Sequence, residues 1–327
     1  MTTDTTEIAV LLAGKSHPHV NERVKQEFRA IELGEGGLAA LDEATRRSIR
    51  GAAVMTKVDA AFVDALPALE IVGSFGVGYD LVDAKYCASR NIMVTNTPDV
   101  LSEEVADTAL GLLINTVREL PKAEAWLRAG RWKADGAYPL TPATLRGRRA
   151  GIFGLGRIGL AIARRLEALG LTVSYHNRRP VEGVGYEYHA SLKEMATAVD
   201  TIISVVPGGA ATEKIVNAEI FEALGPNGIF INIGRGSTVD ETALIAALSN
   251  GTIRAAGLDV FAEEPNVPEA LLALPNACLL PHVGSSTRHT RTAMADLVVD
   301  NLASWFSGGK AVTPVPETAA LNGEKAP

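Results

Sequence analysis

A glycine-rich turn, Gly154-Leu155-Gly156-Arg157-Ile158-Gly159, constrains the fold of this chain more than any other stretch. The apolar segment 149–153 before it is typical of a buried strand, and the segment 160–169 after it, ended by Gly170, has the pattern of a helix. In a G-x-G-x-x-G turn the first glycine permits a tight bend, the second lets backbone N–H groups approach a pyrophosphate, and the third lets the helix pack on the strand. The helix N-terminus then faces the phosphates. The context therefore predicts a dinucleotide-binding unit rather than a purely structural glycine turn.

Length and charge narrow the remaining possibilities. At 327 residues the chain suits about two domains, and its 47% apolar and 21% charged residues are typical of a globular protein. A net charge of −7 argues against a general nucleic-acid surface. The only cysteines, Cys87 and Cys278, indicate a reducing compartment without a disulfide framework. The N-terminus lacks signal-peptide features and no run is long enough for a membrane span, so we expect a cytoplasmic protein.

Strands and helices alternate over the first hundred residues, which predicts a parallel sheet separate from the dinucleotide unit. Strands are expected at 7–13, 29–33, 51–56, 69–74 and 92–95, with helices at 38–50, 59–66 and 83–90. The first of these strands is followed by a polar stretch with Gly14, His17, Pro18 and His19, to which no element is assigned. The glycine-rich turn of this sheet, at 75–79, follows a late strand rather than the first, so this sheet is not the dinucleotide unit.

The rest of the chain is expected to build a second, doubly wound sheet. Residues 100–130 form an apolar-rich helical region interrupted at Pro121, which crosses between domains or packs on a partner subunit, and 131–148 is expected to be irregular. Six strands are then predicted, at 149–153, 171–175, 200–206, 228–233, 255–260 and 277–280, before a long helix at 287–305. The polar tail from Pro314 is expected to be loosely held.

Three residues that follow strands of the second sheet are candidates for chemistry: Arg235, Glu264 and His282. Ligands of such sheets bind beyond the carboxyl ends of the strands, where these residues can converge. An arginine offers a planar fork to a carboxylate, and a histidine beside a glutamate can be held as imidazolium and give a proton to a carbonyl oxygen. Taken singly, each has an ordinary interpretation, as a surface turn residue, a loop acid and a structural histidine.

Other kinds of active site find little support. The remaining histidines lack this setting, and all but His176 are expected to be solvated: His17, His19, His189 and His289. No His, Cys and Asp set has the spacing of metal ligands, so no metal is expected. No serine lies in a strand–elbow–helix signature of a nucleophile.

Four motifs together resemble those of the D-isomer-specific 2-hydroxyacid dehydrogenases, and the resemblance covers about residues 5–316. They are Gly154–Gly159, Asn232-Ile233-Gly234-Arg235-Gly236, the stretch from Gly257 to Pro265, and Pro281-His282-Val283-Gly284. Residues 74–80 and 96–101 most resemble the glyoxylate/hydroxypyruvate reductases, including the plant hydroxy(phenyl)pyruvate type. The resemblance implies an α/β protein of two doubly wound parallel-sheet domains, with a Rossmann cofactor domain (100–287) inserted into a flavodoxin-like substrate domain (1–99 and 288–327).

The same resemblance implies roles for individual residues. Arg235 would bind the substrate carboxylate and polarise the keto group, His282 would protonate the carbonyl oxygen as the nicotinamide delivers hydride, and Glu264 would hydrogen-bond to His282 and orient it. The N–H groups of Val77 and Gly78 would hold the carboxylate from the other domain. The predicted substrate residues are Phe75, Gly76, Val77, Gly78, Arg235 and His282. The predicted cofactor contacts are Thr108, Gly154, Leu155, Gly156, Arg157, Ile158, Gly159, Asn177, Arg178, Arg179, Val206, Pro207, Thr212, Ile233, Arg235, Asp259, His282 and Gly284.

The strand after the glycine-rich turn predicts the choice of cofactor. NAD enzymes place an acidic residue at its end to bind the ribose 2′-OH, whereas here it ends in Asn177-Arg178-Arg179. Two arginines suit a 2′-phosphate, so we expect NADPH to be preferred and NADH to be weaker. One departure from the family's pattern is Gly208-Gly209 in the loop after 205–206, which loses a side-chain hydroxyl near the cofactor.

The expected activity is therefore NADPH-dependent reduction of glyoxylate and hydroxypyruvate, to glycolate and D-glycerate. Two alternatives stay open: a reductase of larger 2-keto acids such as hydroxyphenylpyruvate, and a non-catalytic NAD(P)H-sensing protein like the corepressors that share this fold. The family architecture also implies a homodimer through the region from Val100 to Trp132, and a small 2-keto acid rather than nucleic acid or membrane as partner.

Overall fold

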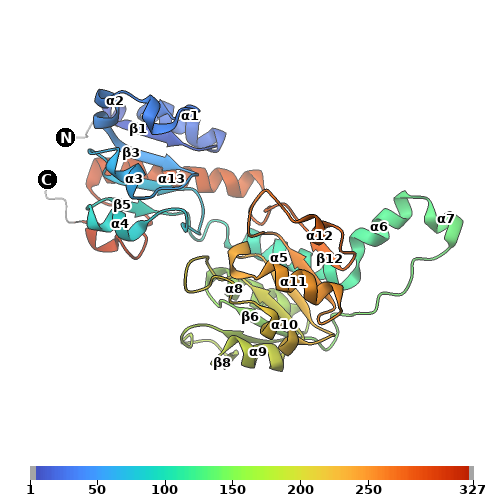
Figure 1. Cartoon of the computed structure of the whole chain (residues 1–327). Helices are drawn as coiled ribbons and strands as arrows, with labels where there is room; N and C mark the ends of the chain where they lie inside the picture. The colour runs from blue at the N-terminus through green and yellow to red at the C-terminus, as the bar shows by residue number, and fades with distance from the viewer. Residues whose placement is uncertain (1–4, 324–327) are drawn as a thin grey trace. The chain divides into compact units, whose positions relative to one another are not determined.

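The computed structural model describes residues 5–323, and the chain divides into two compact units. The first unit comprises the residues up to Leu101 together with those from Thr287 onward, and the second unit is Ser102–Ser286 (Figure 1). Each contains one parallel sheet, so the predicted α/β fold with two parallel sheets is confirmed. Within the described residues, no helix is both long enough and apolar enough to cross a membrane. The domain limits predicted at 99/100 and 287/288, and the roles assigned to the two parts, stay predictions.

The first unit is built on a five-stranded sheet in the order β2-β1-β3-β4-β5. Its strands are β1 (Ala9–Ala13), β2 (Arg29–Glu32), β3 (Ile49–Val54), β4 (Ile71–Ser74) and β5 (Met93–Thr95). Its helices are α1 (Pro18–Glu27), α2 (Glu43–Ser48), α3 (Ala60–Asp64), α4 (Ala84–Ser89) and α13 (Arg288–Gly308). Alternate residues of β1 enter two different cores, Leu11 with Phe62 of α3 on one face and Val10 with Leu302 of α13 on the other. Both faces of the sheet are therefore buried, as parallel sheets require.

Helix α1 lies at the polar stretch to which the sequence pattern assigned no element. Pro18 stands at its first position, where a missing backbone N–H has no intrahelical partner to lose. His17 is the N-cap, and its side chain accepts a hydrogen bond from His19 N at 3.3 Å. Only Val20 and Val24 of this helix are buried, so its apolar stripe is too short to be detected as a period.

The C-terminal tail is also better held than expected. Val315 is 1% exposed and its N–H donates to Val94 O at 2.9 Å. The fully buried Thr318 accepts the Val94 N–H on its hydroxyl at 3.1 Å. The tail thus continues beyond the sheet edge as a bonded segment. An apolar pattern could not reveal this, because the bonds are made by backbone groups and one hydroxyl.

The second unit is built on a seven-stranded sheet in the order β12-β11-β10-β9-β6-β7-β8. Its strands are β6 (Arg149–Phe153), β7 (Thr172–His176), β8 (Glu187–His189), β9 (Thr201–Ser204), β10 (Ile229–Asn232), β11 (Ala255–Leu258) and β12 (Ala277–Leu279). Its helices are α5 (Ser102–Arg118), α6 (Leu120–Arg128), α7 (Arg131–Asp135), α8 (Arg157–Ala168), α9 (Leu192–Ala198), α10 (Ala218–Leu224), α11 (Glu241–Ser249) and α12 (Glu269–Leu272). Six strands were predicted for this sheet, and the edge strand β8 was missed because its three residues are too few to show a pattern.

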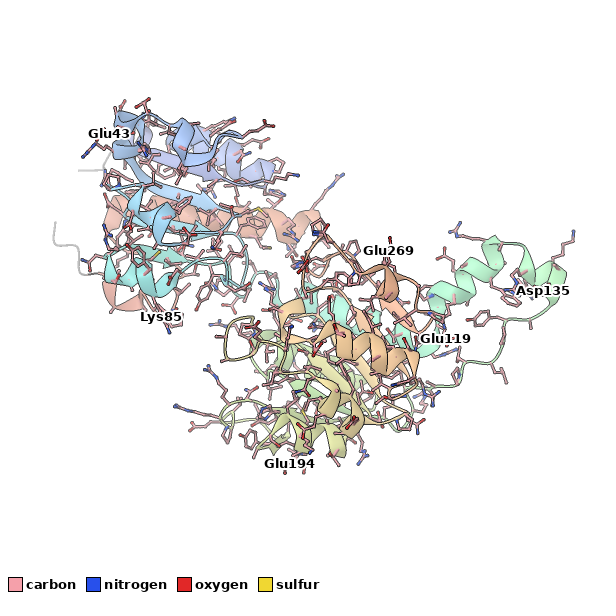
Figure 2. All side chains as sticks on the ribbon, in the orientation of Figure 1. Glu43, Lys85, Glu119, Asp135, Glu194 and Glu269 are labelled. Carbon is pink, nitrogen blue, oxygen red and sulfur yellow. The ribbon has the colours of Figure 1, made fainter. Side chains whose placement is uncertain are left out.

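Helices α6 and α7 form an arm that projects from the rest of the second unit (Figure 1). The break after α5 falls at Glu119, which has a φ of +51°, and Pro121 lies inside the first turn of α6 rather than at the interruption. Figure 2 labels Glu119 at the base of this arm and Asp135 toward its far end. The short helix α7 replaces the irregular segment expected from residue 131.

Candidate active site

The three glycines of the turn between β6 and α8 have three different surroundings. Gly154 has a φ of +103°, and a Cβ there would lie 2.9 Å from Cγ1 of Val206. A Cβ on Gly159 would lie 2.3 Å from Gly154 O, so α8 packs on the turn only without a side chain. A Cβ on Gly156, in contrast, would meet nothing within 4 Å. The middle glycine therefore leaves an open approach to the N-terminus of α8, which is the cradle that a pyrophosphate needs.

The end of β7 closes one side of this cradle. Asn177 Oδ1 accepts the Leu155 N–H at 2.7 Å, so its side chain fixes the glycine-rich turn. Arg178 and Arg179 follow, both exposed, and neither side chain makes a hydrogen bond within residues 5–323. Two exposed guanidinium groups therefore follow directly after Asn177, the residue that binds the turn. This is the arrangement that a 2′-phosphate would use.

The loop after β9 borders the turn from the neighbouring strand. Val206 is buried against Gly154, and Pro207 is exposed after it. The hydroxyl of Thr212 donates to the carbonyls of Pro207 and Gly209, at 2.7 and 3.2 Å, so it closes the loop on itself. The glycine pair at 208–209 is accommodated by this closure, with Gly209 at a φ of +127°.

Arg235 lies on a loop fixed at the end of β10. Asn232, 1% exposed, donates from Nδ2 to Arg235 O at 2.9 Å and accepts the Gly234 N–H on Oδ1 at 3.1 Å. Thr238 Oγ1 donates to the same Arg235 carbonyl at 2.7 Å. A Cβ on Gly236 would lie 1.8 Å from the carbonyl carbon of Phe261, so this loop packs directly on the backbone that leads to Glu264. Asn232 was not among the predicted residues, although a polar residue that ends a buried strand is the available signal.

Glu264 and His282 form a hydrogen-bonded pair beyond β11 and β12. Nδ1 of His282 lies 2.7 Å from Oε2 of Glu264, and Oε1 of Glu264 accepts the Phe261 N–H at 3.1 Å. Burial alone would raise the pKa of Glu264, but the hydrogen bonds from His282 and Phe261 and the charges of His282 and Arg235 together hold it below the ordinary value. The carboxylate is therefore ionised beside the imidazole, and its hydrogen bond orients the ring.

Asp259, at the end of β11, holds the turn that carries His282. Its carboxylate accepts the N–H groups of Val283 and Gly284 at 2.7 and 2.8 Å, and its carbonyl accepts the His282 N–H at 2.8 Å. Asp259 is 1% exposed, and burial raises its pKa against these hydrogen bonds. His282 itself has a φ of +52°, a strained conformation that persists where surrounding bonds enforce it.

The strand order brings these residues to one edge. Strands β10, β11 and β12 are parallel neighbours, as are β6 and β9, so their carboxyl ends meet at the same edge of the sheet. Thr108 of α5 reaches this edge too, with Oγ1 donating to Gly284 O at 3.1 Å. Ile233, 7% exposed, lies after β10.

The expectation that His189 is solvated is wrong. Its side chain lies at the end of strand β8, which was not predicted, and the residue is 4% exposed.

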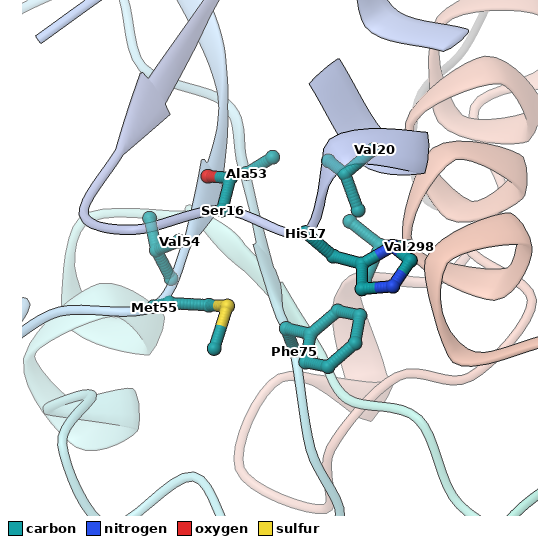
Figure 3. Close-up of a pocket in the computed structure, with 8 residues that line it drawn as sticks. All are labelled: Ser16, His17, Val20, Ala53, Val54, Met55, Phe75 and Val298. Atoms are coloured by element: carbon teal, nitrogen blue, oxygen red, sulfur yellow. The ribbon is translucent and has the colours of Figure 1, made fainter. Parts of the chain in front are cut away.

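The predicted substrate loop, 75–79, lies in the first unit after β4. No hydrogen bond within residues 5–323 uses the N–H groups of Val77 or Gly78, although the loop is half-buried. Two neighbouring unpaired N–H donors are an anion-binding arrangement. Phe75 is stacked with His17, whose ring centroid lies 5.8 Å away, and Figure 3 shows Met55 beside the same ring. These side chains bound the space next to the loop.

Comparison with known proteins shows the family. A model of the D-isomer specific 2-hydroxyacid dehydrogenase NAD binding domain matches residues 110–284. The glyoxylate/hydroxypyruvate reductase A of Arabidopsis thaliana is 46% identical over 311 residues, which are 94% of this chain and 99% of the plant protein. The chain belongs to the D-isomer specific 2-hydroxyacid dehydrogenase family.

Further members of this family are similar along most of the chain. The NADPH-dependent glyoxylate/hydroxypyruvate reductase of Sinorhizobium meliloti, solved with NADP and malonate, is 58% identical with a TM-score of 0.94, covering 98% of this chain and 99% of that one. The hydroxyphenylpyruvate reductase of Plectranthus scutellarioides is 49% identical over 79% of this chain and 82% of its own length. The resemblance inferred from the motifs is thus confirmed, whereas the role of each site residue stays a prediction.

Proposed function

We propose that this 2-hydroxyacid dehydrogenase is an NADPH-dependent reductase of glyoxylate and hydroxypyruvate. The observation that carries the proposal is the hydrogen bond of 2.7 Å between His282 Nδ1 and Glu264 Oε2, next to the loop that fixes Arg235. A proton donor oriented by a carboxylate beside an arginine fork is what reduction of a 2-keto acid requires of the protein. The similarity to glyoxylate/hydroxypyruvate reductases of a plant and a bacterium supports the substrate class.

Each residue has a distinct part in the proposed reaction. Arg235 binds the substrate carboxylate and polarises the keto oxygen, since its fork matches a carboxylate in plane. His282 gives the proton on Nε2 to that oxygen, and Glu264 keeps the ring oriented and its positive charge compensated. The unpaired N–H groups of Val77 and Gly78 also bind the carboxylate. NADPH, when bound, supplies the hydride.

The residues around the glycine-rich turn fit a phosphorylated dinucleotide. The open side of Gly156 admits a pyrophosphate to the start of α8, and Asn177 holds the turn in place. Arg178 and Arg179 are exposed and lie where NAD enzymes carry an acid. The bacterial relative solved with NADP supports the same preference.

We also propose that the protein is a homodimer assembled through the arm. Leu127 and Trp132 on this arm are 55% and 63% exposed, and Leu140 after it is 98% exposed. Apolar side chains on a projecting segment favour burial against a second copy. Light scattering during gel filtration tests this. The wild type is expected to have twice the mass of one chain, and a variant with both Leu127→Asp and Trp132→Asp is expected to have a lower mass. The cytoplasmic location stays a prediction.

The direct test of the activity is NADPH oxidation with a panel of 2-keto acids. We expect glyoxylate and hydroxypyruvate to be turned over with higher kcat/KM than hydroxyphenylpyruvate, the substrate class of the Plectranthus relative. Faster turnover of hydroxyphenylpyruvate would select the larger substrate instead. No turnover of any 2-keto acid, with NADPH still bound, would favour the non-catalytic sensor.

A further inference from the structure

The loop 75–79 of the first unit is held at two points, one by the segment after β5 and the other by the C-terminal tail. Three carbonyls of this loop, those of Gly76, Val77 and Tyr79, each accept a hydrogen bond. Within the described residues, the N–H groups of Val77 and Gly78 donate none. The Gly76 carbonyl shares a planar peptide unit with the Val77 N–H, and the Val77 carbonyl shares one with the Gly78 N–H. A hydrogen bond that fixes either carbonyl therefore also fixes the direction of the corresponding N–H group.

The first tether is the segment after β5. Asn96 Nδ2 donates to Val77 O at 2.8 Å. Thr97 bonds the loop twice, with its N–H donating to Gly76 O at 2.8 Å and its hydroxyl accepting the Gly76 N–H at 3.1 Å. Asn96 thus holds the carbonyl of the peptide whose N–H belongs to Gly78, one of the two free donors.

The tail supports this first tether from behind. Thr313 Oγ1 donates to Asn96 O at 2.6 Å, and the Asn96 N–H returns a bond to Thr313 O at 3.4 Å. Thr313 is itself fixed by the fully buried Asn301 of α13, whose Oδ1 accepts the Thr313 N–H at 2.8 Å. A short antiparallel bridge joins Thr95 and Pro314 beside these bonds. These bonds therefore hold the backbone of Asn96 in place at the end of β5.

The second tether is a side-chain bond at the other end of the loop. The phenol of Tyr79 donates to Oε2 of Glu317 at 3.0 Å. Burial, reinforced by the carboxylate of Glu317, raises the pKa of Tyr79 to about 12, so the phenol keeps its proton at every pH where the enzyme is assayed. Glu317 lies one residue before the buried Thr318, so its backbone is as firmly placed as the tail.

We propose that Asn96 and Glu317 are positioning residues that aim the N–H groups of Val77 and Gly78 at the substrate carboxylate. Neither residue touches the reacting atoms; each acts through the loop. The inference rests on the proposed function, in which the loop binds that carboxylate. In this proposal the C-terminal tail affects the affinity for the substrate and not the rate of the chemical step.

The test compares Glu317→Ala, Tyr79→Phe and Asn96→Ala with the wild type in steady-state reduction of glyoxylate. Loss of one such bond is expected to raise KM for glyoxylate about fivefold, with kcat changed by less than about twofold and KM for NADPH unaltered. The dissociation constant of malonate, measured by calorimetry on enzyme saturated with NADP, is expected to rise by a similar factor. Glu317→Gln keeps an acceptor for the phenol and should restore wild-type values.

A matched control lies in the same unit. The phenol of Tyr86 donates to Asp64 Oδ1 at 2.7 Å and accepts from Arg90 Nη1 at 3.0 Å, and within the described residues it bonds neither the loop nor the tail. Tyr86→Phe therefore removes a tyrosine hydroxyl elsewhere in the unit and should leave KM unchanged. Unchanged KM and malonate affinity in both Glu317→Ala and Tyr79→Phe would overturn the inference, as would an equal rise in Tyr86→Phe. Tyr79→Phe removes one hydroxyl and keeps the test valid if Asn96→Ala does not fold. A wild type without turnover contradicts the proposed function instead, and the tethers are then judged on malonate affinity.

Discussion

The imidazole of His282 and the carboxylate of Glu264 are joined by a hydrogen bond of 2.7 Å from Nδ1 to Oε2, and the second carboxylate oxygen is held by the Phe261 N–H. The carboxylate is thus fixed at both oxygens, which sets the plane of the ring. Nε2 makes no hydrogen bond among residues 5–323, and the His282 side chain is 46% exposed. The ring nitrogen that faces away from Glu264 is therefore available to a substrate oxygen.

Replacing the carboxylate should weaken this proton donor. Glu264→Gln keeps the shape but removes the negative charge that compensates imidazolium, so we expect kcat/KM for reduction to fall about 10- to 100-fold near neutral pH. The dissociation constant of NADPH serves as control and should not change. A variant that keeps the wild-type kcat/KM would show that Glu264 does not support the proton donor.

The same carboxylate predicts a pH-dependent stability difference. The pKa of Glu264 is lower in the folded protein than in the unfolded chain, so at intermediate pH the unfolded chain binds more protons. Its contribution to stability is therefore present above the ordinary glutamate pKa of about 4.3 and is lost as pH falls through the folded value. The melting temperatures of wild type and Glu264→Gln should differ at pH 7, and this difference should shrink as the pH falls below the ordinary glutamate pKa. A constant difference across this range would contradict the assignment.

Cofactor choice should depend on the arginines after β7. Arg178→Ala removes a forked donor from the proposed 2′-phosphate site, so we expect KM for NADPH to rise about tenfold while KM for NADH stays the same. Arg146→Ala, an exposed arginine that precedes the start of β6 rather than following a strand end, is the matched control. Equal effects on both cofactors, or none on either, would place the 2′-phosphate elsewhere.

Asp259 should affect both stability and rate. Asp259→Ala leaves the N–H groups of Val283 and Gly284 without acceptors. Each lost bond should lower the free energy of unfolding by about 1–3 kcal/mol. Because these bonds hold the strained turn at His282, kcat should fall together with the free energy of unfolding. Urea denaturation and kcat measured on the same preparation check this. A variant with lower stability and wild-type kcat would show that the turn keeps its geometry without Asp259.

A structural ion pair offers a prediction far from the chemistry. Arg148, whose side chain is 9% exposed, donates from Nη1 to Asp200 Oδ1 at 3.0 Å and from Nη2 to Asn227 O at 3.2 Å. Arg148→Ala leaves the carboxylate of Asp200 without its cation and removes the bond to Asn227 O, and it should lower the free energy of unfolding by about 3 kcal/mol. Denaturant titration measures the loss. Because Arg148 precedes β6, at the other end of the strand from the turn, kcat at low temperature should change little; a large fall would link this pair to the active site.

The sequence predicted those parts of the molecule that depend on local pattern. The glycine-rich turn has a strand before it and a helix after it, and Arg235, Glu264 and His282 follow three neighbouring strands. Strand β8 and helix α1 were missed because three residues and two buried valines carry too little pattern.

Hydrogen bonds between polar groups that are distant in sequence could not be predicted. The Tyr79–Glu317 bond spans 238 residues and the Thr313–Asn96 bond 217, and neither partner stands out by spacing. Asn232 and Asn177 look like ordinary strand ends, yet each fixes a functional loop through its amide. Such contacts follow from the topology, which places the ends of separate strands side by side.

In the proposed reaction, His282 is the proton donor for reduction of a 2-keto acid. The most direct measurement is the oxidation of NADPH at saturating glyoxylate by the wild type and by His282→Ala, together with NADPH binding to both. We predict turnover by the wild type, a loss of at least about 100-fold in the variant, and equal NADPH affinity. Undiminished turnover by His282→Ala, or NADPH binding without turnover by the wild type, would contradict it.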